Sequence, residues 1–258
     1  MRASSVDAVD HLIGTPGRLR EERRSGRWVL GTISLVILLF VYLPLLVVVA
    51  MSFNSSASSS SFTGLSFRWY SEFFRSGDLV AALRNSILVA AATTAGSVLL
   101  GCTSAIALHR LKFRGRKLYE AVLLMPFVLP EMVTGLSLLI FFTAFRVPLS
   151  LLTVTIGHIL FTLSIAHRTI GARLLSMPPN LEEASVDLGA SWLRTLRLVT
   201  LPYLGNSLIA AALLVFTISF DQTVITIMVT GTANTLPMVI WSTLRRGLPA
   251  HEGCLHRW

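Results

Sequence analysis

The most regular feature of the sequence is a series of long stretches of hydrophobic residues, separated by short polar segments. One bilayer crossing by a helix needs about 20 apolar residues. Five stretches reach that length, namely residues 28–51, 85–108, 121–145, 147–166 and 204–228. Because every backbone donor and acceptor in hydrocarbon must be satisfied within its own segment, each stretch is predicted to be a helix. The pattern therefore predicts an all-α membrane protein, a polytopic bundle of five transmembrane helices.

Two carboxylates interrupt these stretches, Glu131 in the third and Asp221 in the fifth. A charged side chain within a membrane is costly, so it usually faces a cavity, a partner or a substrate path. We therefore predict both as substrate-pathway residues. Two other interpretations stay open: Glu131 pairs with a partner protein, or Asp221 lies in solvent at the membrane interface.

Composition and charge agree with a lipid environment and also indicate how the chain is oriented in the membrane. Hydrophobic residues make up 53% of the 258 and charged residues 14%, whereas soluble domains carry about 25% charged residues. The net charge is +9, yet fifteen of the 22 Lys and Arg residues fall before residue 28, in 110–117 or in 168–197. This distribution follows the positive-inside rule and predicts a cytoplasmic N-terminus, with basic residues facing anionic lipid. It argues against a role in nucleic-acid binding.

The segment between the fourth and fifth stretches is unusually long, from residue 167 to 202. Pro178 and Pro179 end the preceding helix, and Asn180 can cap a new one with Glu183 as its capping-box partner. Gly189 permits a turn, and a second short helix is predicted from Ser191 towards Pro202. Such a projection suits docking into a groove on another protein, but it also suits an interfacial helix resting on lipid.

This segment resembles a known motif. Glu183-Ala184-Ser185, three residues, Gly189, nine residues and Val199-Thr200-Leu201-Pro202 are similar to the EAA loop of binding-protein-dependent ABC importer permeases. The resemblance covers residues 28 to about 248. Further stretches resemble the polyamine (spermidine/putrescine) branch: Tyr42-Leu43-Pro44, Ser52-Phe53-Asn54, Arg68-Trp69-Tyr70, Phe113-Arg114-Gly115-Arg116, Met125-Pro126, Leu129-Pro130-Glu131, Ser219-Phe220-Asp221 and Thr235-Leu236-Pro237.

The resemblance implies a type I ABC importer permease fold with cytoplasmic coupling helices. It implies three kinds of partner: a second permease, a cytoplasmic ATPase dimer and an extracytoplasmic substrate-binding protein. The substrate would be a polyamine or a similar small cation, although Gln222 stands where many relatives have a second acid. The coupling-loop positions carried over are Glu182, Glu183, Ala184, Ser185, Asp187, Gly189, Leu201 and Pro202.

Other functions fit the sequence less well. It contains no G-x-x-x-x-G-K-[ST] loop, no Gly-x-Ser-x-Gly and no His-Glu-x-x-His, so we predict neither catalytic residues, nor a bound metal, nor a cofactor. His109, His158 and His167 are interpreted as snorkelling or bundle hydrogen-bonding residues, and Gly96 and Gly101 as sites of close helix packing. The alternatives are a permease for an amino acid or sugar, or a stand-alone secondary transporter.

The predicted domain organisation has three parts. These are a cytoplasmic arm (1–27), a transmembrane domain (28–247, with the loop at 180–202) and an atypical tail (248–258). Permeases of this family have six spans, and no sixth stretch is found after residue 247. Either residues 236–244 form a short outer helix with no sixth span, or the C-terminus is truncated or frame-shifted. Truncation is the preferred interpretation.

Overall fold

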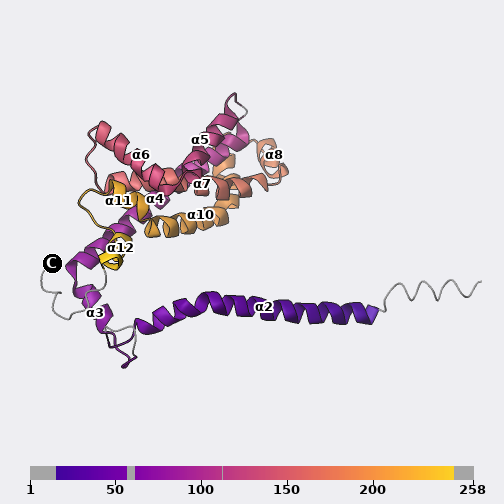
Figure 1. Ribbon diagram of the computed structural model, residues 1–258. Helices are drawn as coiled ribbons and strands as arrows, with labels where there is room; N and C mark the ends of the chain where they lie inside the picture. Colours follow the sequence, from indigo (N-terminus) through magenta and orange to yellow (C-terminus); the bar gives the residue numbers. More distant parts are fainter. Residues whose placement is uncertain (1–15, 57–61, 112, 247–258) are drawn as a thin grey trace, which may run out of the picture. The chain divides into compact units, whose positions relative to one another are not determined.

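The computed structural model describes residues 16–56, 62–111 and 113–246, which are mostly helical (Figure 1). The chain divides into two units, 1–73 and 74–258. The helices are α2 (Pro16–Met51), α3 (Arg68–Arg75), α4 (Gly77–Arg110), α5 (Arg116–Val128), α6 (Glu131–Ala144), α7 (Leu151–Leu175), α8 (Asn180–Asp187), α9 (Trp192–Thr195), the π-helix η1 (Leu196–Thr200), α10 (Leu201–Asp221), α11 (Val224–Val229) and α12 (Leu236–Arg246).

In the first unit, α2 is a single helix that begins at Pro16 and runs without interruption through the first apolar stretch. The predicted arm of residues 1–27 is therefore helical from Pro16, and its first fifteen residues lie outside the described part. After α2, the aromatic rings of Phe53 and Tyr70 stack 5.4 Å apart. The indole Nε1 of Trp69 donates a hydrogen bond to the carbonyl of Asn54 at 2.8 Å. These contacts fold the end of α2 onto α3.

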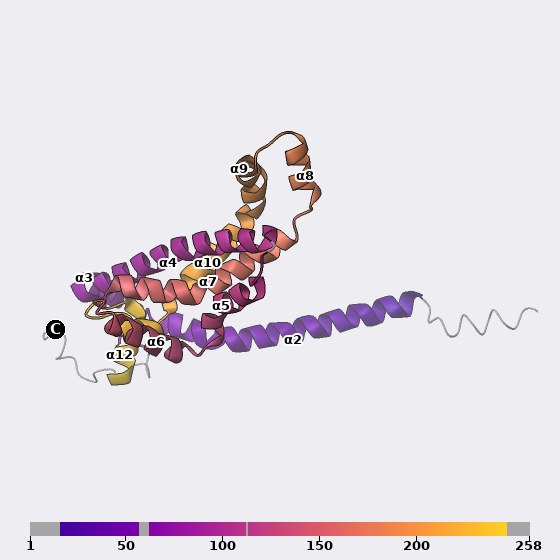
Figure 2. The ribbon, with the colours of Figure 1, turned by 90° about the horizontal axis from the view of Figure 1, so that it is seen from above.

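The second unit is organised around three long helices, α4, α7 and α10, which pack against one another (Figure 2). Small residues allow the close approach of α4 and α7. A Cβ added to Gly101 would lie 2.8 Å from the Cβ of Ala166 and 2.9 Å from the backbone nitrogen of His167. This geometry confirms the packing role predicted for Gly101.

Buried hydroxyl and imidazole groups join the same helices. The Ser97 and Thr162 hydroxyls are 2.8 Å apart, and the Ser104 hydroxyl is 2.7 Å from Nδ1 of His167. In hydrocarbon no water is present to bond to these polar groups, so they form hydrogen bonds with one another across the helices. The prediction that His167 is a bundle hydrogen-bonding residue is confirmed.

The third predicted span is not one straight helix, and the prediction of a continuous helix over 121–145 was wrong. It consists of α5 and α6, which are bent by 106° relative to each other. The break falls at Leu129 and Pro130, both with extended ψ angles (144° and 137°). Proline lacks an N–H and disfavours the helical region for the residue before it, so the helix ends there.

The fifth predicted span, 204–228, is also divided, because α10 ends at Asp221 and α11 begins at Val224. His158 of α7 bonds to both pieces, with Nδ1 2.9 Å from the Ser219 hydroxyl and Nε2 3.0 Å from the Thr226 hydroxyl. Polar groups on α7 thus stabilise a break that hydropathy does not reveal. This also confirms His158 as a bundle hydrogen-bonding residue.

The short helix that one of the two interpretations placed at residues 236–244 is present as α12 (Leu236–Arg246). Its first backbone N–H donates to the Ser86 hydroxyl at 2.8 Å, and the Asn85 amide donates to the carbonyl of Asn234 at 2.9 Å. Both contacts hold the start of α12 against α4. The predicted tail, 248–258, lies outside the described residues.

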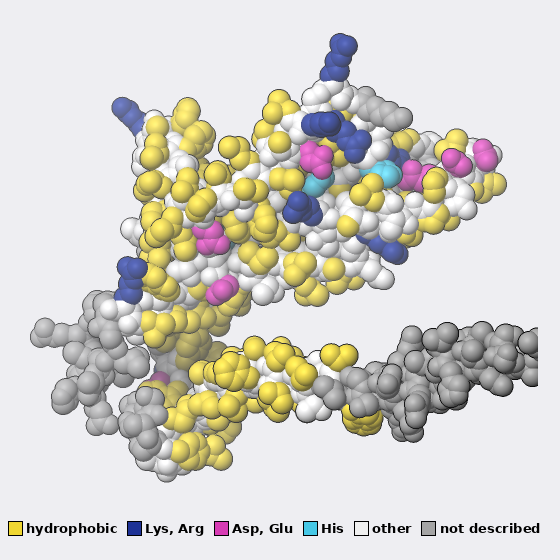
Figure 3. Space-filling model, turned by 45° about the vertical axis from the view of Figure 1, so that its right-hand side comes forward, with side chains coloured by type: hydrophobic (Ala, Val, Ile, Leu, Met, Phe, Trp, Pro, Cys, Tyr) yellow, Lys and Arg dark blue, Asp and Glu magenta, His cyan; other side chains and the backbone are white. Residues whose placement is uncertain are grey.

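Four of the described helical segments are long and apolar enough to cross a membrane: Leu30–Met51, Gly77–Arg110, Leu151–Leu175 and Trp192–Asp221. The bent pair α5 and α6 makes a fifth if it crosses as one span. Hydrophobic side chains cover much of the visible surface (Figure 3), as expected for helices solvated by lipid.

Candidate functional site

The candidate site is the segment that projects from the bundle between α7 and α10 (Figure 2). Its first helix, α8, begins at Asn180, and Pro179 occupies the cap position with helical angles (φ −59°, ψ −33°). The predicted capping box of Asn180 and Glu183 is not formed. Proline is pre-organised for the first turn of a helix, so the helix starts one residue early and Asn180 is its first residue rather than its cap.

A tight turn at Gly189 ends this helix. Gly189 has φ +78°, a left-handed conformation that glycine adopts readily and other residues rarely adopt. Its N–H donates to the carbonyl of Val186 at 2.8 Å, and the Ala190 N–H donates to the carbonyl of Ser185 at 3.1 Å. Among the described residues, no heavy atom other than those of its chain neighbours lies within 4 Å of where a Cβ would stand. The prediction of a glycine turn at this position is confirmed.

The second predicted short helix is not a separate element. Helix α9 begins after Ser191 as expected, then continues through η1 into α10, so that Trp192–Asp221 is one helical run of 30 residues. Leu201 and Pro202 lie in the first turn of α10 instead of closing the projection. Pro202 has no N–H to donate back into the preceding turn, which agrees with the wider π geometry of η1. The projection is therefore continuous with the last long span through one helical run.

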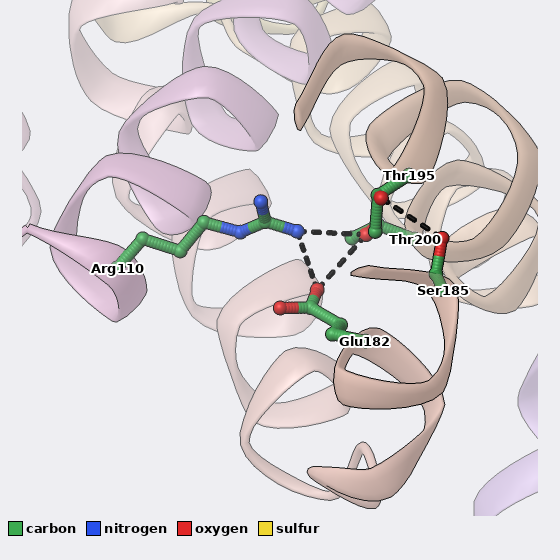
Figure 4. Close-up of polar contacts among 5 residues, drawn as sticks. All are labelled: Arg110, Glu182, Ser185, Thr195 and Thr200. Atoms are coloured by element: carbon green, nitrogen blue, oxygen red, sulfur yellow. Dashed lines mark hydrogen bonds and ion pairs between the residues drawn. The ribbon is translucent and has the colours of Figure 1, made fainter. Parts of the chain in front are cut away.

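The two adjacent glutamates of α8 point in different directions. Glu182 is half-buried and forms an ion pair with Arg110, the last residue of α4. The Thr200 hydroxyl donates to the same carboxylate oxygen of Glu182 at 2.9 Å, and Arg110 donates to Thr200 at 2.8 Å (Figure 4). Glu183, by contrast, is exposed. Of the two adjacent acids, Glu182 therefore points into the protein and Glu183 points to its surface.

A second hydrogen bond closes the projection on itself. The Ser185 and Thr195 hydroxyls are 2.9 Å apart, joining α8 to α9 (Figure 4). Thr195 and Thr200 are buried, at 3% and 0% exposure. Both hydroxyls contribute to the shape of the loop, and sequence reasoning missed both. Arg110 was counted only among the basic residues, and nothing in its local sequence indicates a partner 72 residues away.

The outward side of the projection combines apolar and acidic groups. Leu188 is 89% exposed, Val186 62% and Trp192 60%, and the exposed Ala184 and Asp187 lie on the same short helix. We call the set Glu183, Ala184, Val186, Asp187 and Leu188 the docking tip. Exposed apolar side chains grouped in one place commonly mark a protein interaction site.

The two carboxylates predicted for a substrate path lie at helix interruptions. Glu131 is the first residue of α6, directly after the bend, and is partly buried. Asp221 is the last residue of α10, directly before the break, and is exposed. Neither carboxylate forms a hydrogen bond or ion pair with another residue of the part of the chain that the structure describes.

A comparison with protein families matches residues 97–247 to the model described as "Binding-protein-dependent transport system inner membrane component". The putrescine transport system permease protein PotI of Escherichia coli K12 is 36% identical over 217 residues, which cover 81% of this chain and 77% of PotI. The spermidine/putrescine transport system permease protein PotC of the same strain is 31% identical over 231 residues, covering 89% and 88%.

The fold is also found among solved structures. A bacterial ABC transporter involved in the import of the acidic polysaccharide alginate is similar with a TM-score of 0.69 at 14% identity, covering 89% of this chain and 88% of that one. A second structure, of the alginate transporter in complex with an alginate pentasaccharide-bound periplasmic protein, has a TM-score of 0.63 at 13% identity. At these identities the similarity shows the fold alone.

Proposed function

Because this chain belongs to the family of binding-protein-dependent transport system inner membrane components, we propose that it conducts a polyamine across the inner membrane. It is a multi-pass permease component of an ABC importer. The observation that supports the polyamine is its 36% and 31% identity to PotI and PotC over most of the chain. Under this proposal an amino-acid or sugar permease is the alternative.

The proposed assembly has three partners. A second permease subunit completes the pore, a dimeric cytoplasmic ATPase hydrolyses ATP, and an extracytoplasmic binding protein delivers the substrate. The periplasmic protein in the second alginate transporter structure is consistent with the last of these. In this arrangement residues 28–247 are the transmembrane domain and 1–27 the cytoplasmic arm.

The proposed orientation has the N-terminus and the α8–α9 projection in the cytoplasm. The basic segment after α4 is predicted to be cytoplasmic from its charge, and Arg110 at the end of α4 contacts Glu182 of α8. The projection and this basic segment therefore belong to the same side of the membrane, which supports the orientation independently of the loop motif.

The docking tip is the proposed contact with the ATPase. An apolar side chain as exposed as Leu188 loses contact with water when a groove covers it, and this burial favours association. Glu183 and Asp187 then face the partner at the rim of the contact. Gly189 sets the angle of the tip, Ser185 joins it to α9, and Leu201 and Pro202 lie where the projection becomes α10.

Glu131 and Asp221 are proposed to line the substrate path. A polyamine carries several ammonium groups, and each loses hydration as it enters the membrane domain. Carboxylates without a partner at two helix interruptions would offset that cost. Both lie beside a break in which the backbone leaves helical geometry, and irregular backbone in a membrane is tolerated where it lines a cavity.

This proposal is tested by uptake of radiolabelled putrescine into proteoliposomes that contain the full importer. ATP-dependent uptake is expected from the native chain. In Glu131→Gln and Asp221→Asn the apparent KM for putrescine should rise about tenfold, equivalent to about 1.4 kcal/mol per lost charge contact. Asp78→Asn, which removes an exposed acid from the first turn of α4, is the matched control and should stay within about twofold.

Two results would contradict the proposal separately. If the native importer transports neither putrescine nor spermidine but does transport an amino acid or a sugar, the assignment of a polyamine as the substrate is wrong. If both neutralised variants keep the native KM and rate, these carboxylates do not line the path.

A further inference from the structure

We propose that Arg110 is a positioning residue that fastens α4 to the coupling loop, so that a displacement of α8 moves α4 as well as the helices that the loop joins covalently. This inference rests on the proposed function, and it assigns the two adjacent acids of the motif to different tasks. Glu182 belongs to a contact inside this chain, and Glu183 to the partner surface.

The geometry is a closed triangle of polar groups drawn from three helical elements (Figure 4). One guanidinium nitrogen of Arg110, at the end of α4, bonds to both Glu182 of α8 and Thr200 of η1. Thr200 in turn donates to the Glu182 oxygen that Arg110 contacts. Because each member touches the other two, no single element can shift without breaking two of the three bonds.

Burial makes the loss of one member of the triangle more costly than the loss of one partner of an ordinary surface ion pair. The side chain of Arg110 is 16% exposed and that of Glu182 28%, while Thr200 is fully buried. Exposed pairs contribute little because water screens them and their side chains lose entropy. In a partly desolvated site, removal of one partner leaves the other charge uncompensated, and that state is strongly disfavoured.

The triangle joins α4 to α8 directly, in addition to the packing of α4 on α10. Helix α8 packs on α9 and η1, which are continuous with α10, and α7 leads directly into α8. Helix α4 is far from α8 in sequence, and Arg110 at its end bonds to α8; the Arg110 guanidinium also lies 5.8 Å from the ring centre of Trp192 on α9. All three core helices are thereby attached to the same projection.

A purely structural role would predict a different pattern of defects. If the triangle only helped the chain to fold, its loss would lower the amount of folded protein without changing how well ATP hydrolysis and transport are linked. If it transmits movement to α4, its loss changes the ratio of putrescine transported to ATP hydrolysed in the protein that does fold.

The test compares Arg110→Gln, Glu182→Gln and the exchange Arg110→Glu with Glu182→Arg in the reconstituted importer. Each single variant should transport about tenfold less putrescine per ATP hydrolysed, corresponding to about 1.4 kcal/mol. The exchange should recover at least about half of the native ratio, because the ion pair is restored in reverse. Arg114→Gln, an exposed basic residue close to the end of α4, is the control and should keep the native ratio. An unchanged ratio in both single variants would overturn the proposal.

A second measurement does not depend on transport. Spin labels on cysteines that replace two exposed residues, His109 of α4 and Asp187 of α8, report the distance between these helices in the detergent-solubilised chain. A single narrow distribution is expected, broadening in Arg110→Gln. A distance distribution that is equally broad with and without Arg110 would overturn the proposed role of the triangle, even if putrescine is transported. A narrow distribution that depends on Arg110 would support this role, even if putrescine proves to be the wrong substrate.

Discussion

Gly189→Asp is expected to lower ATP-driven uptake about a hundredfold while the protein still inserts into the membrane in normal amounts. Gly189 has φ +78°, which costs an L-amino acid about 1–2 kcal/mol. Apart from its chain neighbours, no heavy atom of the described residues lies within 4 Å of a Cβ at this position, so we expect the fold of the bundle to persist. The carboxylate would instead stand at the turn beside the docking tip, where the proposed ATPase contact would cover it, and an unpaired buried charge would add to the backbone cost.

Two matched variants separate these contributions. Gly115→Asp introduces the same side chain at a glycine that also has positive φ (+93°) and open space around it, but outside the coupling loop, and it should retain most uptake. Gly189→Asn keeps the size without the charge, and asparagine and aspartate share a tolerance of the left-handed region. The two variants therefore differ in charge alone, and an intermediate loss is expected for Gly189→Asn. Normal uptake in Gly189→Asp would refute the role of this turn in coupling.

Gly101→Leu is expected to have the largest effect on stability, preventing correct packing of α4 against α7. A Cβ at this position would lie 2.9 Å from the backbone nitrogen of His167 and 2.8 Å from the Cβ of Ala166. Backbone cannot rotate away as a flexible side chain can, so the helices must separate. Overpacking of this kind costs about 1–3 kcal/mol or more. Thermal unfolding in detergent should show a Tm lower by about 10 °C, together with a loss of monodisperse protein in size-exclusion chromatography.

Gly205→Leu is the size-matched control, since nothing lies within 4 Å of a Cβ at Gly205 in α10. Its side chain should face lipid and leave the Tm close to the native value. If the Tm of Gly101→Leu equals that of the native protein, the close contact between α4 and α7 is not present in the protein.

The spans could be predicted from sequence because hydropathy is a local property, and a run of apolar residues is what a membrane-spanning helix requires. The long segments of α2, α4, α7 and α10 were located in this way, and the turn at Gly189 followed from residue type. Pro130 also carries a local signal for the bend between α5 and α6, although the uninterrupted apolar run masked it. Asp221 interrupts the fifth apolar stretch at the place of the break after α10, but its geometry could not be predicted, because Ser219 and Thr226 bond to His158 of another helix.

The candidate site shows the same limit. The motif identifies a segment and its glycine, but the directions of its adjacent acids depend on contacts that are distant in sequence. Glu182 points inward because it forms an ion pair with Arg110 and accepts a hydrogen bond from Thr200. Glu183, the next residue, is exposed. The second short helix was misjudged for a related reason, since α9 is stabilised as part of the continuous helix that becomes α10.

The central claim is that the α8–α9 projection docks on an ATPase, and site-specific cross-linking tests it most directly. A single cysteine at Leu188, with Cys102 and Cys254 replaced, should form a cross-link to the ATPase subunit in native membranes. A cysteine at Leu65, which is 80% exposed and is predicted to lie on the opposite side of the membrane, should form none. A fully assembled complex in which position 188 does not cross-link to the ATPase, or in which position 65 does, would contradict the account.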